Sequence, residues 1–534
     1  MEDPSATWTK PSEVIVIHPG SRNLRIGFAT QSAPLVFPHC VARRLKTPSA
    51  PKSQPYLPKT IRSQELFRYV NDKAEQLGNV LANSDTSQGV KRSDIDEADP
   101  LNVGRVTLDI GSDYHEPEQT QQNVFGEDAL NLSPSANFNL QWPMKKGRLH
   151  LHRGPGGSMF SALHDLFDIW MWAVTEKLKA EPKNLCAVLV IGDVYIGEHV
   201  KRMLDMMFNE MGFRKVFVHL EGVCAAFGAG NPTACVIDVG ESKTLVACVE
   251  DGISLKQTRV LMEFGGGDMT QLMCFLFKVR MQWRNPNPDI VYDARLLEKV
   301  KEKFCHLDLD HCGSVDGEVA YSPPGRAGPQ VFPVSVQDEA MKCVLGFFAP
   351  EVLSLTGHKG SHLYAPQAAD PQDPHDDFYI LQTQRRRGDA EFEDGEDEDG
   401  MPVDLKDPVR QETIPVSQVL GIDVVLLQSV DRCENEDVKR KMLSNILIVG
   451  GGLANFKGVA KWLKNRLSTR MPQSFKDDII EISTQPKDLP ADCCVWRGAA
   501  LMTHLDTSQE LWITSREWTR FGSKVLRERA VFGW

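Results

Sequence analysis

The stretch that decides the fold is VIVIHPGSRNLRIGFA, residues 14–29. Its β-branched residues favour a buried strand, and Pro19 and Gly20 mark a tight turn before a second, alternating apolar segment. Residues 234–252, ACVIDVGESKTLVACVEDG, repeat this plan with two strands around a turn at 238–243. Two similar strand–turn–strand units far apart in one chain indicate an internal duplication.

Strands and helices alternate between the two hairpins. Apolar residues at helical spacing predict helices over 159–178 and 198–213, and continuous apolar runs predict strands at 185–192 and 215–220. Such alternation is typical of a parallel α/β sheet.

A third strand–turn unit lies near the C-terminus, in SNILIVGGGLANFKGVAKWLKNRL, residues 444–467. We interpret it as a strand, a glycine-rich turn and a helix. The turn places Gly450, Gly451 and Gly452 at the carboxyl edge of a sheet, where α/β proteins bind ligands.

Length and composition indicate a soluble protein with more than one hydrophobic core. The chain has 534 residues, of which 41% are hydrophobic and 25% charged, and single cores stop growing below this length. No apolar run approaches the roughly 20 residues that span a bilayer. The acidic, polar first ten residues argue against a secretory signal peptide, so we expect an intracellular protein without membrane contact.

The cysteines and charges exclude several kinds of site. The 12 cysteines are scattered through apolar segments without a C-x-x-C motif, which predicts reduced core thiols and no structural metal. The net charge of −12 argues against nucleic-acid binding by the whole surface. The acidic run at 389–400 is expected to be a disordered loop, either a solvated linker or a segment attracted to basic partners such as histones.

Three glycine-containing turns could bind phosphate, because such turns present backbone N–H groups with little side-chain bulk. They are Gly20-Ser21, 240–242 and 450–452. Each alone is more often a structural turn than a ligand loop. The three together, in the order hairpin, hairpin and strand–turn–helix, are more specific evidence for a phosphate site than any single turn.

These segments resemble the actin fold, which actins, actin-related proteins, sugar kinases and Hsp70-type chaperones share. Actins are the most similar branch, through VKEKFCHLDLD at 300–310, FGEDA at 125–129, NILIVGGG at 445–452 and the segment 495–522. The segments HPGS, 373–384 and 515–534, with the long N-terminal insertion, resemble more narrowly a nuclear actin-related protein. The resemblance implies a duplicated, ribonuclease H-like α/β fold with two lobes around a nucleotide cleft.

The resemblance also implies a domain organisation with two large insertions. Residues 1–12 are expected to form a flexible tail, 45–124 a polar, partly disordered insertion, and 360–415 an acidic, disordered one. The first lobe would comprise 13–44, 125–230 and 488–534, and the second lobe 231–359 and 416–487.

Residue by residue, the resemblance implies a site for ATP, or ADP, with Mg²⁺. Asp238 would order the water shell of the metal, a coordination that suits Mg²⁺. The other implied nucleotide-binding positions are Gly20, Ser21, Arg22, Gly240, Glu241, Ser242, Lys301, Glu302, Gly450, Gly451 and Gly452.

The departures from the family pattern predict nucleotide binding with little or no hydrolysis. His18 replaces the first-loop Asp, and Arg22 replaces a loop glycine and could hold a phosphate oxygen. Glu221 replaces the Gln that positions the attacking water in the family, and Leu245 replaces the partner His of that Gln. No catalytic residue is therefore assigned. Proton-transfer groups contribute about 10²–10⁴-fold in rate. A degenerate, empty cleft is the alternative.

The narrower resemblance implies a nuclear subunit of an Ino-eighty-type chromatin remodeller. Its partners would be the motor subunit, actin, another actin-related protein, histones and nucleosomal or linker DNA, with roles in transcription and DNA repair. The insertion at 45–124 falls on a loop that actin uses in filaments, so we expect no polymerisation. Two alternatives stay open: an actin-fold small-molecule kinase or ATPase, and a cytoskeletal actin-related protein.

Basic residues that could contact DNA form two sets, although such residues are more often merely solvated. They are Arg43, Arg44, Lys46, Lys52, Lys59 and Arg62 near the insertion, and Arg516, Arg520, Lys524, Arg527 and Arg529 near the C-terminus.

Overall fold

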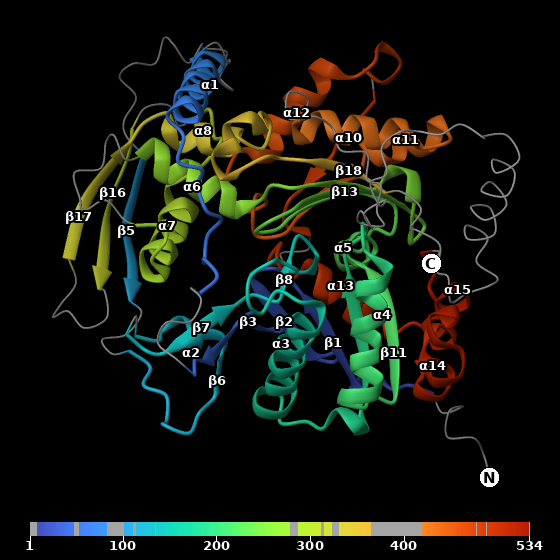
Figure 1. Ribbon diagram of the computed structural model, residues 1–534. Coiled ribbons are helices and arrows are strands. Elements are labelled where there is room, and N and C mark those ends of the chain that lie inside the picture. The colour runs from blue at the N-terminus through green and yellow to red at the C-terminus, as the bar shows by residue number, and fades with distance from the viewer. Residues whose placement is uncertain are drawn as a thin grey trace, which may run out of the picture.

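Two α/β lobes face each other across the middle of the molecule (Figure 1). The structure is a computed structural model that describes residues 8–46, 53–82, 101–109, 114–133, 135–277, 287–310, 314–322, 330–364, 419–476, 478–486, 489–532 and 534. The acidic run at 389–400 and Lys52 lie outside these residues.

The first lobe contains a six-stranded sheet in the order β21-β11-β10-β1-β2-β3. Its central strand β1 is fully buried and pairs parallel with β10 and antiparallel with β2. The hairpin predicted from the opening stretch is therefore confirmed. The bounds are β1 (Val14–Pro19), β2 (Asn23–Phe28), β3 (Leu35–Pro38), β10 (Cys186–Ile191), β11 (Lys215–Leu220) and β21 (Ile513–Thr514).

The second lobe repeats this topology, as the predicted duplication requires. Strand β12 pairs antiparallel with β13 and parallel with β19, and the order is β18-β15-β13-β12-β19-β20, with β14 beside β13. The bounds are β12 (Ala234–Val239), β13 (Thr244–Glu250), β14 (Ile253–Ser254), β15 (Val260–Met262), β18 (Ser361–Leu363), β19 (Ile446–Val449) and β20 (Ile482–Ser483).

Helices α5 (Glu221–Ala229) and α13 (Cys494–Met502) lie between the two sheets (Figure 1). They cross so closely that a Cβ added to Gly498 would lie 1.7 Å from the carbonyl oxygen of Cys224. Buried side chains of these helices belong to a core that also includes Val236 and Val449 of the second sheet. This packing joins the lobes below the cleft.

Further helices pack around the sheets and against one another, and α6 (Gly266–Phe277) among them is buried on almost all sides. In the first lobe they are α3 (Met159–Trp172) and α4 (Gly197–Asp205), both within the predicted helical segments. In the second lobe they are α6 (Gly266–Phe277), α7 (Val291–Phe304), α8 (Glu339–Leu345), α10 (Ile422–Asp431), α11 (Glu436–Leu443) and α12 (Val459–Arg470).

Parts of the segment 45–124 are ordered and belong to the second lobe. Helix α1 (Gln64–Ala82) packs against α8 and the turn Pro350–Thr356, and buries Val70, Ala74 and Leu81. This helix was missed at the sequence level, although Leu66, Val70, Ala74, Leu77 and Leu81 recur at helical spacing.

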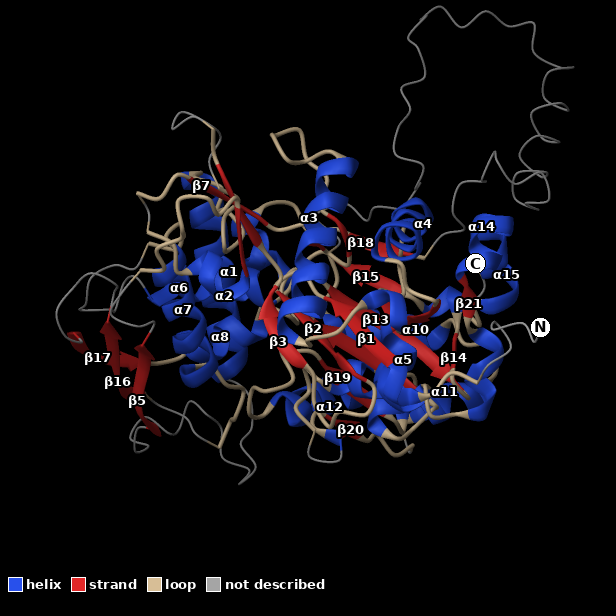
Figure 2. Ribbon diagram, turned by 90° about the horizontal axis from the view of Figure 1, so that it is seen from below, coloured by secondary structure: helices blue, strands red, loops and turns tan. Residues whose placement is uncertain are grey.

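Strand β5 (Leu101–Asp109) of the same segment pairs parallel with β16 (Val315–Ser322), which pairs with β17 (Gln330–Val336). Figure 2 shows this three-stranded sheet at one edge of the molecule. The segment is therefore anchored to the second lobe at two places.

Smaller units complete the first lobe. Strands β4 (Val41–Arg44), β6 (Asn123–Phe125) and β7 (Phe138–Gln141), with α2 (Gly126–Leu130), enclose a core of their own around Trp142. The hairpin β8 (Met144–Lys145) and β9 (Arg148–Leu149) lies at the cleft, and α14 (Ser515–Phe521) and α15 (Val525–Arg529) end the chain.

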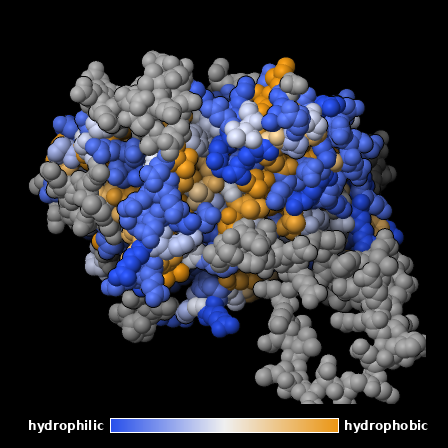
Figure 3. All heavy atoms as spheres, turned by 90° about the horizontal axis from the view of Figure 1, so that it is seen from above, coloured by the Kyte–Doolittle hydropathy of each residue, from blue (hydrophilic) through white to orange (hydrophobic). Residues whose placement is uncertain are grey.

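The face of the molecule in Figure 3 is mainly hydrophilic, with hydrophobic side chains reaching it in places. No helix in the described ranges is long and apolar enough to cross a membrane. Every cysteine in the described part of the chain is a free thiol, and all but the half-buried Cys493 are buried, as predicted for core cysteines.

Candidate functional site

A cavity of about 350 Å³ lies between the lobes, at the turns of both hairpins. It brings together almost all of the predicted nucleotide-binding positions. Ser242 does not line it but contacts Ser21, which does, and Leu245 is buried in β13 away from it. Its lining includes Gly20, Ser21, Arg22, Asp238, Gly240, Glu241, Lys301, Glu302, Gly450, Gly451 and Gly452.

The first loop is fixed from beneath by a buried histidine. His39 Nδ1 lies 2.8 Å from the carbonyl oxygen of Gly20, and its Nε2 accepts a hydrogen bond from Trp170 Nε1 at 3.2 Å. Burial lowers the pKa of His39 to about 4, so this histidine is neutral and Nδ1 carries the proton. Sequence reasoning missed His39, because nothing in its neighbourhood distinguishes it from a core histidine.

The two hairpin loops touch each other directly. Ser242 Oγ of the second lobe donates a hydrogen bond to Ser21 Oγ of the first at 2.9 Å, and accepts one from the Lys146 backbone N–H. The second loop is closed by a bond of 2.9 Å from the Gly240 N–H to the Lys243 carbonyl. A ligand in the cavity would therefore contact both lobes at once.

The third glycine turn packs against the second loop. Gly450 has φ +85°, and a Cβ there would lie 2.3 Å from the Val239 carbonyl oxygen, so only glycine fits. The Gly452 N–H donates to the same carbonyl at 2.8 Å. The predicted strand, turn and helix are present as β19, residues 450–452 and α12.

Arg22 joins the lobes through carboxylates. Its guanidinium lies 2.5 Å from Glu241 and 3.5 Å from Glu298, and stacks 3.6 Å above the Tyr56 ring. Burial lowers the pKa of Arg22, but Glu241, Tyr56 and Glu298 together outweigh it and the net shift is upward. These contacts differ from the phosphate contact that we expected, and Glu298 was missed by sequence reasoning.

Lys301 and Glu302 lie at one end of the cavity. The buried Lys301 Nζ donates to the Gly266 carbonyl at 3.0 Å and to Thr270 Oγ1 at 2.8 Å. Glu302 is exposed and pairs with Lys299 at 2.9 Å. At the opposite wall, Arg25 pairs with Asp492 at 3.0 Å, a contact that the sequence pattern gave no reason to expect.

The comparisons with known proteins agree with this geometry. The family model described as Actin matches residues 9–531. The chain belongs to the actin family. Relatives named actin-related protein 8 are 34% identical in Danio rerio, over 98% of this chain and 92% of theirs, and 35% identical in Aedes aegypti, over 98% and 97%.

A solved structure described as human actin-related protein Arp8 in its ATP-bound state is also similar. It has a TM-score of 0.81 and 31% identity, and the similarity covers 98% of each chain. The actin fold is thus confirmed, as is the narrower resemblance to actin-related protein 8 that we based on 515–534 and the long insertion.

Glu221, which the resemblance aligns with a Gln that orients water in the family, is bonded on both carboxylate oxygens. Oε1 lies 3.3 Å from His18 Nε2, and Oε2 accepts from Lys243 Nζ. Burial raises the pKa of Glu221, but Lys243 and then His18 outweigh it and hold it at about 2. Burial, and next the charge of Glu221, raise the pKa of Asp238 to about 7.

The residues present do not fit a divalent metal of the family's kind. Mg²⁺ is bound through several waters and one or two carboxylates, whereas the Lys243 ammonium already occupies Glu221. No group of three or more His, Cys, Asp or Glu side chains in the described ranges could hold a metal. Lys243 was missed by sequence reasoning, although a lysine within a predicted phosphate turn was a usable signal.

The basic sets predicted for DNA are only partly available. Arg43 is bonded to Asp165 at 2.5 Å and to Asp168 at 2.9 Å, and Arg44 stacks on Phe138. Lys46, Lys59 and Arg62 are exposed.

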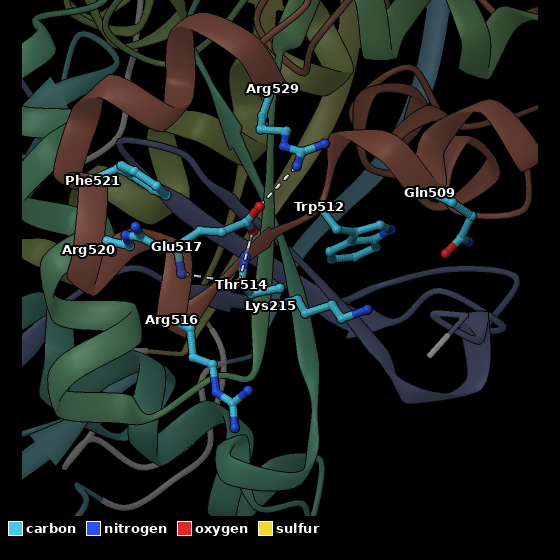
Figure 4. Close-up of a pocket in the computed structure, with 9 residues that line it drawn as sticks. All are labelled: Lys215, Gln509, Trp512, Thr514, Arg516, Glu517, Arg520, Phe521 and Arg529. Atoms are coloured by element: carbon cyan, nitrogen blue, oxygen red, sulfur yellow. Dashed lines mark hydrogen bonds and ion pairs between the residues drawn. The ribbon is translucent and has the colours of Figure 1, made fainter. Parts of the chain in front are cut away.

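Near the C-terminus, Arg516, Arg520 and Arg529 line a second cavity of about 420 Å³, which Figure 4 shows beside Trp512 and Lys215. Arg529 pairs with Glu517 at 2.9 Å, and Glu517 also bonds to Thr514 at the start of α14. Lys524 and Arg527 do not line this cavity.

Proposed function

We propose that the cleft binds ATP and holds it with little or no hydrolysis, so that the nucleotide acts as a structural ligand between the lobes. The observation that carries the proposal is the meeting of three glycine turns, from both lobes, around one cavity. Glycine-rich turns are a common means of binding anionic ligands through backbone N–H groups. The similar human protein is described as ATP-bound, which supports ATP over other phosphate compounds.

The chemistry of Glu221 and Leu245 supports slow or absent turnover. A carboxylate with a pKa of about 2 is a poor general base at neutral pH, since efficient bases titrate near the working pH. Both of its oxygens are also engaged. Leu245 carries no proton-transfer group and is 1% exposed, so it cannot assist a water molecule.

A retained nucleotide would stabilise the closed arrangement. At a concentration 100 times its dissociation constant, a ligand that binds only the folded state adds about 2.7 kcal/mol. Whole domains are stable by only about 5–15 kcal/mol, so this contribution is substantial. Loss of ATP should therefore loosen the two lobes.

Calorimetric titration with ATP tests the binding, with Gly451→Leu as the blocking variant. Gly451 has no atom other than Asp492 Cβ within 4 Å of an added Cβ, so a larger side chain there enters the cavity without displacing the backbone. We expect saturable ATP binding by the wild type and none by the variant, which should retain its unfolding temperature without nucleotide. Absence of wild-type binding would refute the proposal.

The same proposal assigns the protein a nuclear role as a non-polymerising subunit of an Ino-eighty-type chromatin remodeller. Its expected partners are the motor subunit, actin and another actin-related protein, together with histones and linker DNA. Support comes from the relatives named actin-related protein 8 and from the resemblance that implied this assembly. The resemblance places the segment 45–124 at a loop that actin uses in filaments, and α1 of this segment packs on the second lobe.

Affinity purification of the tagged protein from nuclear extract tests this role. We expect actin and a remodeller motor to be recovered with it, and nucleosomes with linker DNA to be retained more strongly than nucleosome cores. Sedimentation at actin-polymerising salt should leave the protein in the supernatant. Recovery with only cytoskeletal or metabolic proteins, or pelleting as filaments, would contradict the proposal.

A further inference from the structure

We propose that the Lys243 ammonium takes the place of the divalent cation, so that this cleft binds ATP without a metal ion. The inference rests on the proposed ATP binding and deepens it. Its basis is the position of one buried lysine side chain among the groups that would otherwise surround a metal.

Lys243 reaches the cavity from the turn between β12 and β13. It lines the cavity, is 7% exposed, and donates from Nζ to Glu221 Oε2. The backbone of its own turn is held by the bond from Gly240 to the Lys243 carbonyl. The position of the ammonium group is therefore set by the closed backbone turn that carries Lys243 and by its hydrogen bond to Glu221.

Glycines from two other segments enclose the ammonium group. A Cβ added to Gly147, in the β8–β9 turn, would lie 2.9 Å from Nζ, and one added to Gly192, after β10, would lie 3.2 Å away. The lysine thus fills the space between the β8–β9 turn, the end of β10 and α5. A mobile surface lysine would not be packed on three sides in this way.

The charges around the Lys243 ammonium favour this cation alone and disfavour a divalent ion beside it. Asp238 and Glu221 attract Lys243, and they are the carboxylates that a metal and its waters would need. A divalent ion placed beside them would lie near the ammonium, and like charges in a buried site repel strongly. His18 stands where the family has an acidic residue, so the first loop adds no carboxylate.

Lysine suits the task chemically. Its ammonium binds phosphate as a point charge with three donors, and a buried lysine contacts the β- and γ-phosphates in P-loop proteins. Glu221 occupies one donor of Lys243, which leaves the others for phosphate oxygens. The other cations of the phosphate loops, Arg22 and Arg25, are paired with carboxylates.

Calorimetric titration of the full chain with ATP, once in Mg²⁺ and once in EDTA after removal of metals, tests the inference. We expect dissociation constants that agree within about threefold, and elemental analysis of the ATP complex should find no stoichiometric divalent ion. Affinity more than tenfold weaker in EDTA, or one metal per nucleotide, would overturn it. Absence of binding in both buffers would instead refute the proposed ATP binding.

The variants Lys243→Met and Lys243→Arg test whether metal-independent ATP binding depends on the charge of Lys243. In EDTA, Lys243→Met should bind ATP at least tenfold more weakly than wild type, and Lys243→Arg should recover most of the affinity. Lys439→Met is the control, because Lys439 also pairs with a carboxylate, Asp431, but on the outer helices. Unchanged ATP affinity in a folded Lys243→Met protein would overturn the inference; if that variant does not fold, the wild-type comparison decides.

Discussion

Replacing Glu221 with leucine should destabilise the nucleotide-free protein severely. The side chain is 4% exposed, and its two oxygens bond separately to His18 and Lys243. Leucine fills a similar volume but leaves the 7% exposed Lys243 as a buried charge without its hydrogen-bonded carboxylate. Breaking a buried ion pair in this way costs about 3–5 kcal/mol.

The cost can be converted into a melting temperature. One kcal/mol shifts the unfolding temperature by about 2–4 °C in a domain of about 150–250 residues. We therefore expect Glu221→Leu to lower the first unfolding transition in differential scanning calorimetry by roughly 6–20 °C. The control Glu198→Gln removes an ion pair that is about half exposed, with Arg202, and should cost less than about 1 kcal/mol.

A second substitution separates the effect of breaking the ion pair from the effect of changed packing at position 221. Adding Lys243→Met to Glu221→Leu removes the unpaired charge, and apolar replacements of buried ion pairs are often neutral or stabilising. The double variant should therefore recover most of the lost stability. The reasoning would be refuted if Glu221→Leu alone melted within about 2 °C of wild type, or if the double variant were less stable than the single.

Three further perturbations test other parts of the account. His39 is neutral in the folded protein with a pKa of about 4, against 6.5 in the unfolded chain. Its contribution to stability is therefore complete above pH 6.5 and is lost as the pH falls toward 4. In His39→Gln, the unfolding temperature should depend less steeply on pH between 4 and 6.5, and a slope equal to that of the wild type would contradict the assignment. Gly498→Ala, which forces a Cβ against the Cys224 carbonyl, should lower the unfolding temperature far more than Gly451→Ala, and equal effects would show that the helix crossing tolerates the added atom. Arg22→Ala should increase the radius of gyration of the nucleotide-free protein in small-angle scattering, since it removes the guanidinium between Glu241 and Glu298, and an unchanged radius would show that other contacts hold the lobes.

Local sequence patterns predicted the scaffold of the cleft because they depend on neighbours along the chain. The β-branched runs of β1 and β12 and the three glycine turns are local signals, and each is found where the sequence placed it. The match of two hairpins indicated the duplication, from which the facing arrangement of the loops follows.

The contacts that decide the chemistry join residues far apart in sequence, and no local pattern reports them. Lys243 meets Glu221 and Gly192, and Glu221 meets His18, only after β1, β10, β12 and α5 have packed together. The sequence alone shows no partner for Arg22. In the fold it joins the lobes, because its partners Glu241 and Glu298 belong to the other lobe. Helix α1 is a different case, because its apolar residues recur at helical spacing and this local signal was overlooked within a polar segment.

The retention of intact ATP is the central claim, and extraction of the bound nucleotide tests it most directly. Protein saturated with ATP, freed of excess by gel filtration and held at 25 °C, would be denatured at intervals, and the released nucleotide separated by anion-exchange chromatography. We expect close to one nucleotide per chain, still ATP after several hours. Release of ADP within minutes, or of no nucleotide at the first time point, would contradict it.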